Sequence, residues 1–140
     1  MRISVVPATD ADRPVLANLI QLYLYDFTGF KAWDLQEDGR FGDYGLDGCW
    51  TIDGRHPFLI RADGKLAGFT IVDSRSYLTG ERGIWDMADF FVLRRFQRLG
   101  VGEYVARILF DRFRGHWEVR QMAANLEALA FWRTVINRYT

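Results

Sequence analysis

A short segment with two glycines stands between a strand-like run and a helix-like run, and it limits the folds open to the chain. The segment is Gln97–Gly102, with the letters QRLGVG, which follows ADFFV and precedes EYVARILFDRF. Apolar residues recur at helical spacing from Val101 to Phe113, which predicts a helix that begins near Gly100. The start of a helix presents unpaired backbone N–H groups, and glycines let a ligand approach them closely. The segment therefore indicates either a tight structural turn or a cradle for phosphate.

The hydropathy pattern around this segment predicts a mixed α/β chain. The expected strands lie at residues 3–7, within 56–75 as a hairpin around an Asp63–Gly64 turn, at 83–93 and at 117–124. The expected helices cover residues 15–24, the run that begins near Gly100, and 126–139. Residues 28–54 lack a period, which is typical of a functional or mobile segment. Because 49% of the 140 residues are apolar, we expect a single domain over residues 1–140.

The charges of the chain balance, and its cysteine and histidine residues are few. Eighteen basic and eighteen acidic residues cancel, so neither nucleic acid nor an anionic membrane is expected as a partner. The lone Cys49 cannot form an internal disulfide, and His56 and His116 stand too far apart to indicate a metal site. The N-terminus lacks the apolar core of a signal peptide. We therefore expect a cytoplasmic protein that needs no metal and does not enter the membrane.

The glycine segment matches neither of two common phosphate motifs, because it lacks the Gly-Lys-Ser/Thr of a P-loop and the third glycine of a dinucleotide fingerprint. Instead, VLRRFQRLGVG followed by a helix resembles the acyl-CoA binding motif of the GNAT acyltransferase superfamily. That motif is written Gln/Arg-x-x-Gly-x-Gly/Ala, and Gln97, Gly100 and Gly102 stand in its defining places. Downstream, NLEALAFW is similar to the second motif of the family, Asn-x-x-Ala-x-x-Phe-Tyr, through Asn125 and Phe131.

The resemblance implies a fold, a reaction and an acyl donor. The fold is α/β (α+β), with a mixed, mostly antiparallel central sheet flanked by helices, and the last two strands of the family are missing from the present sequence. The reaction is the direct transfer of an acetyl group from acetyl-CoA to an amine of a small molecule or protein. Because an open sheet edge invites pairing, a homodimer is expected. The alternatives are a sequence that is a piece of a longer protein, and an unusually open acceptor site.

The resemblance also assigns residues to the donor. Backbone groups around Phe91, Val92 and Leu93 would bind the pantetheine arm, with the N–H of Val92 as the donor to the reacting carbonyl oxygen. The residues expected around the pyrophosphate are Gln97, Arg98, Leu99, Gly100, Val101 and Gly102. Asn125 and Phe131 would lie beside the pantetheine, and their alternative roles are a helix cap and core packing.

Amine acetylation also needs a base, and the strand IWDMADFFV contains two carboxylates, Asp86 and Asp89. A carboxylate on such an apolar strand is either buried with a partner or faces a cleft, and both situations perturb its pKa. Strict alternation places Asp86 on the face of Val92, whereas a bulge between the two aspartates would favour Asp89. Both are therefore candidate catalytic residues, and an ion pair with a nearby arginine is the alternative for each.

The proton donor departs from the family pattern. Many members have a tyrosine after the phenylalanine of the second motif, but this chain has Trp132, which carries no acidic hydroxyl. Tyr139, Tyr104 or a water molecule could replace it, or the thiolate could leave unassisted. A non-catalytic CoA-binding module and a protein-interaction module are therefore alternative functions.

The acceptor is expected to bind where the chain is least regular. The residues expected to line its pocket are Tyr23, Asp26 and Trp33, before and at the start of the segment 28–54. Simple packing is the alternative role for each of them, and the sequence does not name the acceptor.

Overall fold

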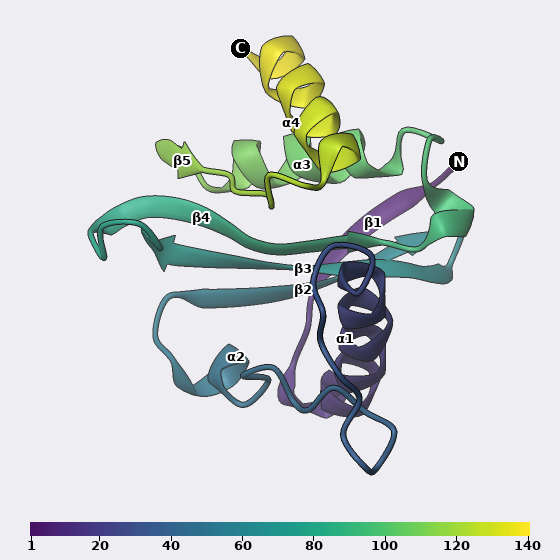
Figure 1. The fold of residues 1–140 in the computed structure, drawn as a ribbon. Helices are drawn as coiled ribbons and strands as arrows, with labels where there is room; N and C mark the ends of the chain where they lie inside the picture. The colour runs from purple at the N-terminus through teal and green to yellow at the C-terminus, as the bar shows by residue number, and fades with distance from the viewer.

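A five-stranded sheet forms the centre of the computed structural model, which describes residues 1–140 (Figure 1). Its strands are β1 (Ile3–Pro7), β2 (Arg55–Ala62), β3 (Lys65–Arg75), β4 (Arg82–Val92) and β5 (His116–Glu118), in that spatial order. Neighbouring strands are antiparallel, except that β4 and β5 are parallel. The predicted mixed, mostly antiparallel sheet is therefore confirmed.

Helices cover both faces of this sheet, and each face has its own apolar cluster (Figure 1). The helices α1 (Arg13–Phe27) and α2 (Gly48–Thr51) lie on one face, and α3 (Val101–Arg112) and α4 (Leu126–Tyr139) lie on the other. Short 3-10 turns, Asp10–Asp12 and Arg94–Phe96, precede α1 and α3. Leu59 packs toward α1 and its neighbour Ile60 packs toward α3, as the period of a strand requires. None of these helices combines the length and the apolarity needed to cross a bilayer.

Local sequence explains the first helix and the hairpin. Pro14 stands in the first turn of α1, where its missing N–H removes no helical hydrogen bond. The buried residues of α1 are Leu16, Leu19, Ile20, Tyr23 and Leu24, which recur at helical spacing and form the face that packs on the sheet. Asp63 (φ 51°) and Gly64 (φ 79°) join β2 to β3 with positive φ at both positions, which is the geometry of a type I′ turn. The predicted helix and hairpin are confirmed.

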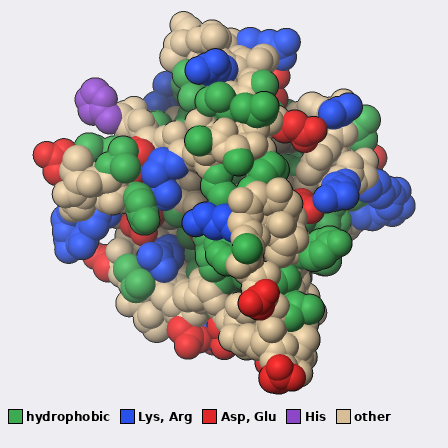
Figure 2. Space-filling model, in the orientation of Figure 1, with side chains coloured by type: hydrophobic (Ala, Val, Ile, Leu, Met, Phe, Trp, Pro, Cys, Tyr) green, Lys and Arg blue, Asp and Glu red, His purple; other side chains and the backbone are tan.

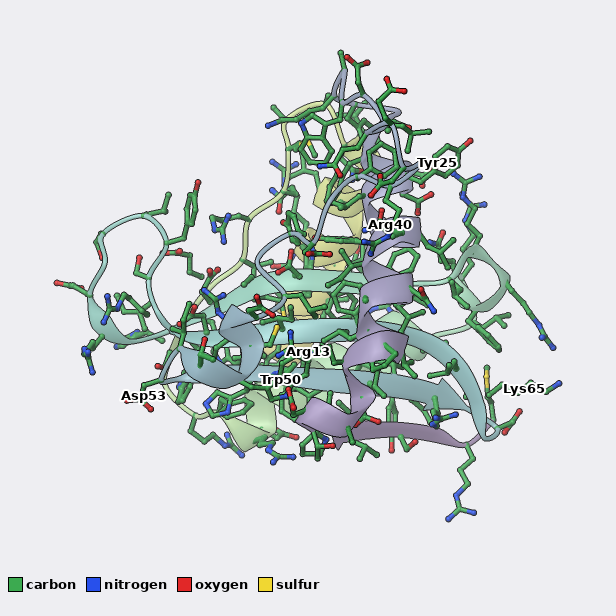
Figure 3. All side chains as sticks on the ribbon, turned by 90° about the horizontal axis from the view of Figure 1, so that it is seen from below. Arg13, Tyr25, Arg40, Trp50, Asp53 and Lys65 are labelled. Atoms are coloured by element: carbon green, nitrogen blue, oxygen red, sulfur yellow. The ribbon has the colours of Figure 1, made fainter.

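The structure differs from the expected elements at two places. The short helix α2 lies inside the irregular segment 28–54, and Trp50 anchors it beside the start of α1 (Figure 3). The indole N–H of Trp50 donates to the carbonyl of Ala8 at 3.0 Å, and the guanidinium of Arg13 lies 4.9 Å from the ring centre. In addition, β5 ends at Glu118, because the chain then leaves β4 and packs Val119 against the cluster beneath α3.

Candidate active site

The strands β4 and β5 separate after a short pairing, which leaves one side of β4 open. Only residues 84–86 of β4 pair with β5, so the rest of β4 has β3 as its only neighbour. The N–H of Leu93 donates to the carbonyl of Ala67 on β3 at 2.7 Å. Along an antiparallel ladder, residue pairs that share hydrogen bonds alternate with pairs that do not. The N–H and carbonyl of Val92 therefore point into the opening, whereas those of Phe91 and Leu93 face β3.

The predicted phosphate segment forms an exposed turn at the end of this opening. The side-chain amide of Gln97 donates to the carbonyl of Val92 at 2.8 Å and ties the turn to β4. Gly100 precedes α3 with φ +82°, and a Cβ placed there would meet no atom within 4 Å. Arg98 (φ +62°) and Leu99 are exposed beside it. The turn thus combines open space with the unpaired N–H groups of a helix start.

Four residues expected beside the donor also take part in packing and capping around α3 and α4. The side chain of Val101 is fully buried, so only its backbone reaches the turn. A Cβ on Gly102 would lie 2.9 Å from Cζ of Phe131, and close packing of the two helices is therefore one reason for glycine there. The side chain of Asn125 accepts a hydrogen bond from the N–H of Ala128 at 3.1 Å, which makes Asn125 the cap of α4.

A core side chain stands where many family members have the tyrosine. Trp132 is buried, with its ring edge-on to Phe90 and Phe131 at centroid distances of 5.0 Å. The hydroxyl of Tyr139 donates to a carboxylate of α3 at 2.6 Å on the exposed side, and Tyr104 is exposed on α3. Neither tyrosine lines the cavity that contains the candidate aspartates.

A bulge on β4 brings the two candidate aspartates onto one face of the sheet. Ile71 of β3 pairs with Asp89, but the next residue of β3 pairs with Met87. Ala88 therefore has no partner on β3 and is an extra residue in β4. As a result, Asp86, Ala88 and Asp89 all line one cavity on the α1 side. Val92 packs on the α3 side, so neither aspartate shares its face, which differs from both sequence-based alternatives.

Asp89 is a buried carboxylate held by two tyrosine hydroxyls. Its Oδ1 accepts hydrogen bonds from Tyr23 at 3.1 Å and from Tyr44 at 3.0 Å. Burial raises the pKa of Asp89, and the two hydroxyls act in the opposite direction. Burial, reinforced by the neighbouring carboxylate, also raises the pKa of both tyrosines, so their hydroxyls remain protonated donors. Its Oδ2 accepts no hydrogen bond within the chain and is not sealed from solvent, so it opens onto the cavity.

Tyr44 reaches Asp89 from the irregular segment 28–54. Its φ of +52° lies in the left-handed region, which is unfavourable for a residue with a Cβ. The side-chain amide of Gln21 on α1 holds the neighbouring backbone, because it donates to the carbonyl of Gly42 at 2.6 Å and accepts from the N–H of Phe41 at 2.7 Å. The irregular segment therefore serves to fix a tyrosine against the buried carboxylate.

Asp86 has the ion pair that was the alternative to a catalytic role. Its Oδ2 accepts a hydrogen bond from Arg120 at 2.8 Å, and the guanidinium of Arg120 lies 3.9 Å from the ring centre of Tyr77. Burial raises the pKa of Asp86, whereas Arg120 lowers it. Oδ1 of Asp86 and Nε of Arg120 are sealed and have no hydrogen-bond partner. Asp86 is thus neutralised by a cation, whereas Asp89 is not.

The cavity that contains both aspartates has a volume of about 600 Å³, which is in the range of small-molecule sites. It lies against the opening, because Asp86 is the last residue of β4 that pairs with β5 and Arg120 follows β5 closely. Its charged side chains are Arg55, Asp73, Arg75, Asp86, Asp89 and Arg120. A smaller cavity of about 280 Å³, between α4 and the segment after β5, has no carboxylate in its lining. The thiol of Cys49 also lines the larger cavity, but burial raises its pKa to about 11, which makes it a poor nucleophile.

The structure does not bring the expected acceptor residues together. Tyr23 contacts Asp89 but does not line the cavity, and the carboxylate of Asp26 binds the exposed Arg94 at 3.0 Å. Trp33 packs edge-on against Phe27, outside the cavity. The reason is that the chain folds back along α1 after residue 28, so the later part of the irregular segment reaches the cavity.

The site also contains residues that were not predicted from the sequence. The structure adds Tyr44, Arg75, Tyr77 and Arg120 to the lining, from the irregular segment, the end of β3 and the segment after β5. The aperiodic segment 28–54 was a signal for the first of them, and the sequence offered none for the others.

Comparison with known proteins agrees with this architecture. Residues 16–135 match the model of the Acetyltransferase (GNAT) family, which covers most of the chain. The chain therefore belongs to this family of acetyltransferases, and the expected fold and enzyme class are confirmed. A search of curated proteins found no match.

Several solved structures share the fold at low sequence identity. An aminoglycoside acetyltransferase from an uncultured soil metagenomic sample, in complex with sisomicin, is 17% identical with a TM-score of 0.66, over 95% of this chain and 86% of that one. The ribosomal-protein-alanine N-acetyltransferase from Brucella melitensis biovar Abortus 2308 is 14% identical with a TM-score of 0.65, over 96% and 90% of the chains. AAC(6')-Iy, in complex with the bisubstrate analog CoA-S-monomethyl-acetylneamine, is 15% identical with a TM-score of 0.67, over 96% and 90%.

Proposed function

We propose that the protein transfers an acetyl group from acetyl-CoA directly to the amine of an acceptor bound in the large cavity. The observation that carries this proposal is the position of Asp89. Its free Oδ2 opens onto a cavity that lies against the opening between β4 and β5. A base, an acceptor cavity and a slot beside a strand are the parts that direct acyl transfer requires.

The residues around the opening fit acetyl-CoA, which supplies the acetyl thioester. The turn from Gln97 to Gly102 would hold the pyrophosphate, since it offers open space beside Gly100 and the N–H groups of a helix start. Among the exposed arginines at and before this turn, Arg94 and Arg98 pair with carboxylates, and Arg95 makes no ion pair and adds positive charge. The N–H of Val92 would donate to the thioester carbonyl oxygen, where negative charge develops during the reaction.

Asp89 is the base in this proposal. Oδ2 of Asp89 first takes a proton from the acceptor ammonium, and the neutral amine nitrogen then forms a bond to the thioester carbonyl carbon. The carbon–sulfur bond breaks, and the proton that the nitrogen loses as it becomes an amide passes through solvent to the departing thiolate. The two tyrosine hydroxyls orient the carboxylate, and its raised pKa makes it a better proton acceptor than an ordinary aspartate. Asp86 stays paired with Arg120 and contributes charge rather than proton transfer. The leaving thiolate needs no dedicated acid, because thiols are already weak acids.

A non-catalytic CoA-binding module is the second candidate, and the buried Trp132 in the place of a tyrosine favours it. The two candidates are separated by mixing the protein with acetyl-CoA and a panel of amines, and by measuring both released thiol and acetylated amine. We expect acetylated product in proportion to thiol. Tight binding of CoA without product from any amine would instead support the module.

The proposal also covers the cellular location, the oligomeric state and the metal requirement of the enzyme. We propose a cytoplasmic homodimer that uses no metal, with pairing at β5, because the outer edge of this strand has no neighbour in the sheet. Figure 2 shows basic and acidic side chains interspersed on the face in view, and the charges of the whole chain cancel, which supports an acceptor other than nucleic acid. Sedimentation at several concentrations tests the dimer, and a monomer at all of them would contradict it.

A further inference from the structure

The charges that line the large cavity balance, but two of them have no partner. Arg55 pairs with Asp73 at 3.3 Å, and Arg120 pairs with Asp86 at 2.8 Å. The carboxylate of Asp89 contacts tyrosine hydroxyls but no cation, and the side chain of Arg75 makes neither an ion pair nor a hydrogen bond. The cavity therefore presents one free negative group and one free positive group.

These two groups lie at different depths of the same cavity. Residues 71, 73 and 75 of β3 alternate onto the cavity face, and Asp89 pairs with Ile71, four residues before Arg75. At a rise of about 3.3 Å per residue, the two positions are about 13 Å apart along the strand. Asp89 is buried next to the opening, and Arg75 is exposed at the rim. The long arginine side chain can shorten this separation.

We propose that the acceptor is a small zwitterion, whose amine approaches Asp89 while an anionic group several bonds away binds Arg75. The inference rests on the proposed acetyl transfer and names the class of its acceptor. A guanidinium binds a carboxylate or a phosphate through paired hydrogen bonds, so either anion fits. A polyamine fits poorly, because Asp89 is the one unpaired carboxylate of the cavity and the unpaired Arg75 would repel a second ammonium group.

The test compares amines that differ only in the anionic group. We would measure kcat/KM for γ-aminobutyrate, δ-aminovalerate and ε-aminocaproate against the alkylamines that lack the carboxylate, with thiol release as the readout. An aminoalkylphosphonate of matched length distinguishes the two anions, and spermidine represents the polyamines. We expect the best zwitterion to exceed its alkylamine by about tenfold or more, which is the effect of one charge-assisted hydrogen bond in a partly exposed site.

The variant Arg75→Gln should remove most of this preference. The matched control is Arg82→Gln, because Arg82 is the cross-strand partner of Arg75, is exposed, and does not line the cavity. Equal kcat/KM for acid and alkylamine, a preference for spermidine, or an equal loss in both arginine variants would overturn the inference and leave acetyl transfer intact. A failure to acetylate any of these amines or those of the wider panel would overturn the proposed function, and this inference with it.

Discussion

Removal of the Tyr23 hydroxyl should destabilise the protein far more than removal of an exposed tyrosine hydroxyl. In Tyr23→Phe the ring keeps its edge contacts with Phe27 and Phe69, at centroid distances of 4.6 and 5.3 Å, so the loss is confined to the hydrogen bond to Asp89. A hydrogen bond to a charged group contributes about 1.5–3 kcal/mol, and Tyr23 and Asp89 are both buried. We therefore expect the free energy of unfolding to fall by about 2 kcal/mol.

Urea unfolding, followed by circular dichroism, measures this difference at constant m-value. The matched control is Tyr139→Phe, which removes a hydroxyl that donates to Asp111 at 2.6 Å on the surface, and we expect a change below about 0.5 kcal/mol. A double-mutant cycle of Tyr23→Phe with Asp89→Asn should give a nonzero coupling energy. If Tyr23→Phe changes stability no more than the control does, the buried tyrosine–carboxylate contact does not exist as described.

Three further predictions concern the carboxylate and the turn. The Tyr44 hydroxyl lowers the pKa of Asp89, so Tyr44→Phe should move the acid limb of the kcat/KM profile to higher pH, and an unmoved limb would exclude Asp89 as the base. Burial raises the pKa of Asp89 above its unfolded value, so its contribution to stability is present at low pH and lost as pH rises through the folded pKa. Urea titrations should therefore show that the free energy of unfolding of Asp89→Asn depends less on pH in that window than that of the wild type. An identical pH dependence would contradict this. Gly100→Val should weaken CoA binding in calorimetry, whereas Gly64→Val, at a similar positive φ in the hairpin turn, should not. Equal losses of CoA affinity in the two variants would indicate a general effect of backbone strain.

The fold could be predicted from the sequence because the residue patterns that indicate it are local. The glycine turn, the Asp63–Gly64 hairpin turn and the helical spacing in α1 each depend on residues close together in the chain. The end of β5 at Glu118 could not be predicted, because no glycine or proline interrupts the residues 119–124 that follow it. Their separation from β4 is decided by tertiary packing, which overrides local propensity.

The candidate site could be predicted only in part, because tertiary packing also decides which side chains meet there. Asp86 and Asp89 stood out because carboxylates are unusual on an apolar strand, but nothing marks Ala88 as the bulge that turns both onto one face. Tyr44 and Arg120 approach these aspartates across 45 and 34 residues of sequence. Such contacts leave no periodic trace in the sequence, so only the folded chain reveals which aspartate is paired with a cation and which is free.

The most direct test of the account is the turnover of Asp89→Asn on a verified amine acceptor. We expect CoA affinity to be retained while kcat/KM falls by about 10²–10⁴-fold, the range of a lost general base, with Asp111→Asn on the exposed side of α3 as the matched control. The loss should shrink as pH approaches the pKa of the amine, because the neutral nucleophile then forms without help. Wild-type turnover by Asp89→Asn across that pH range would contradict the central claim that this carboxylate is the base.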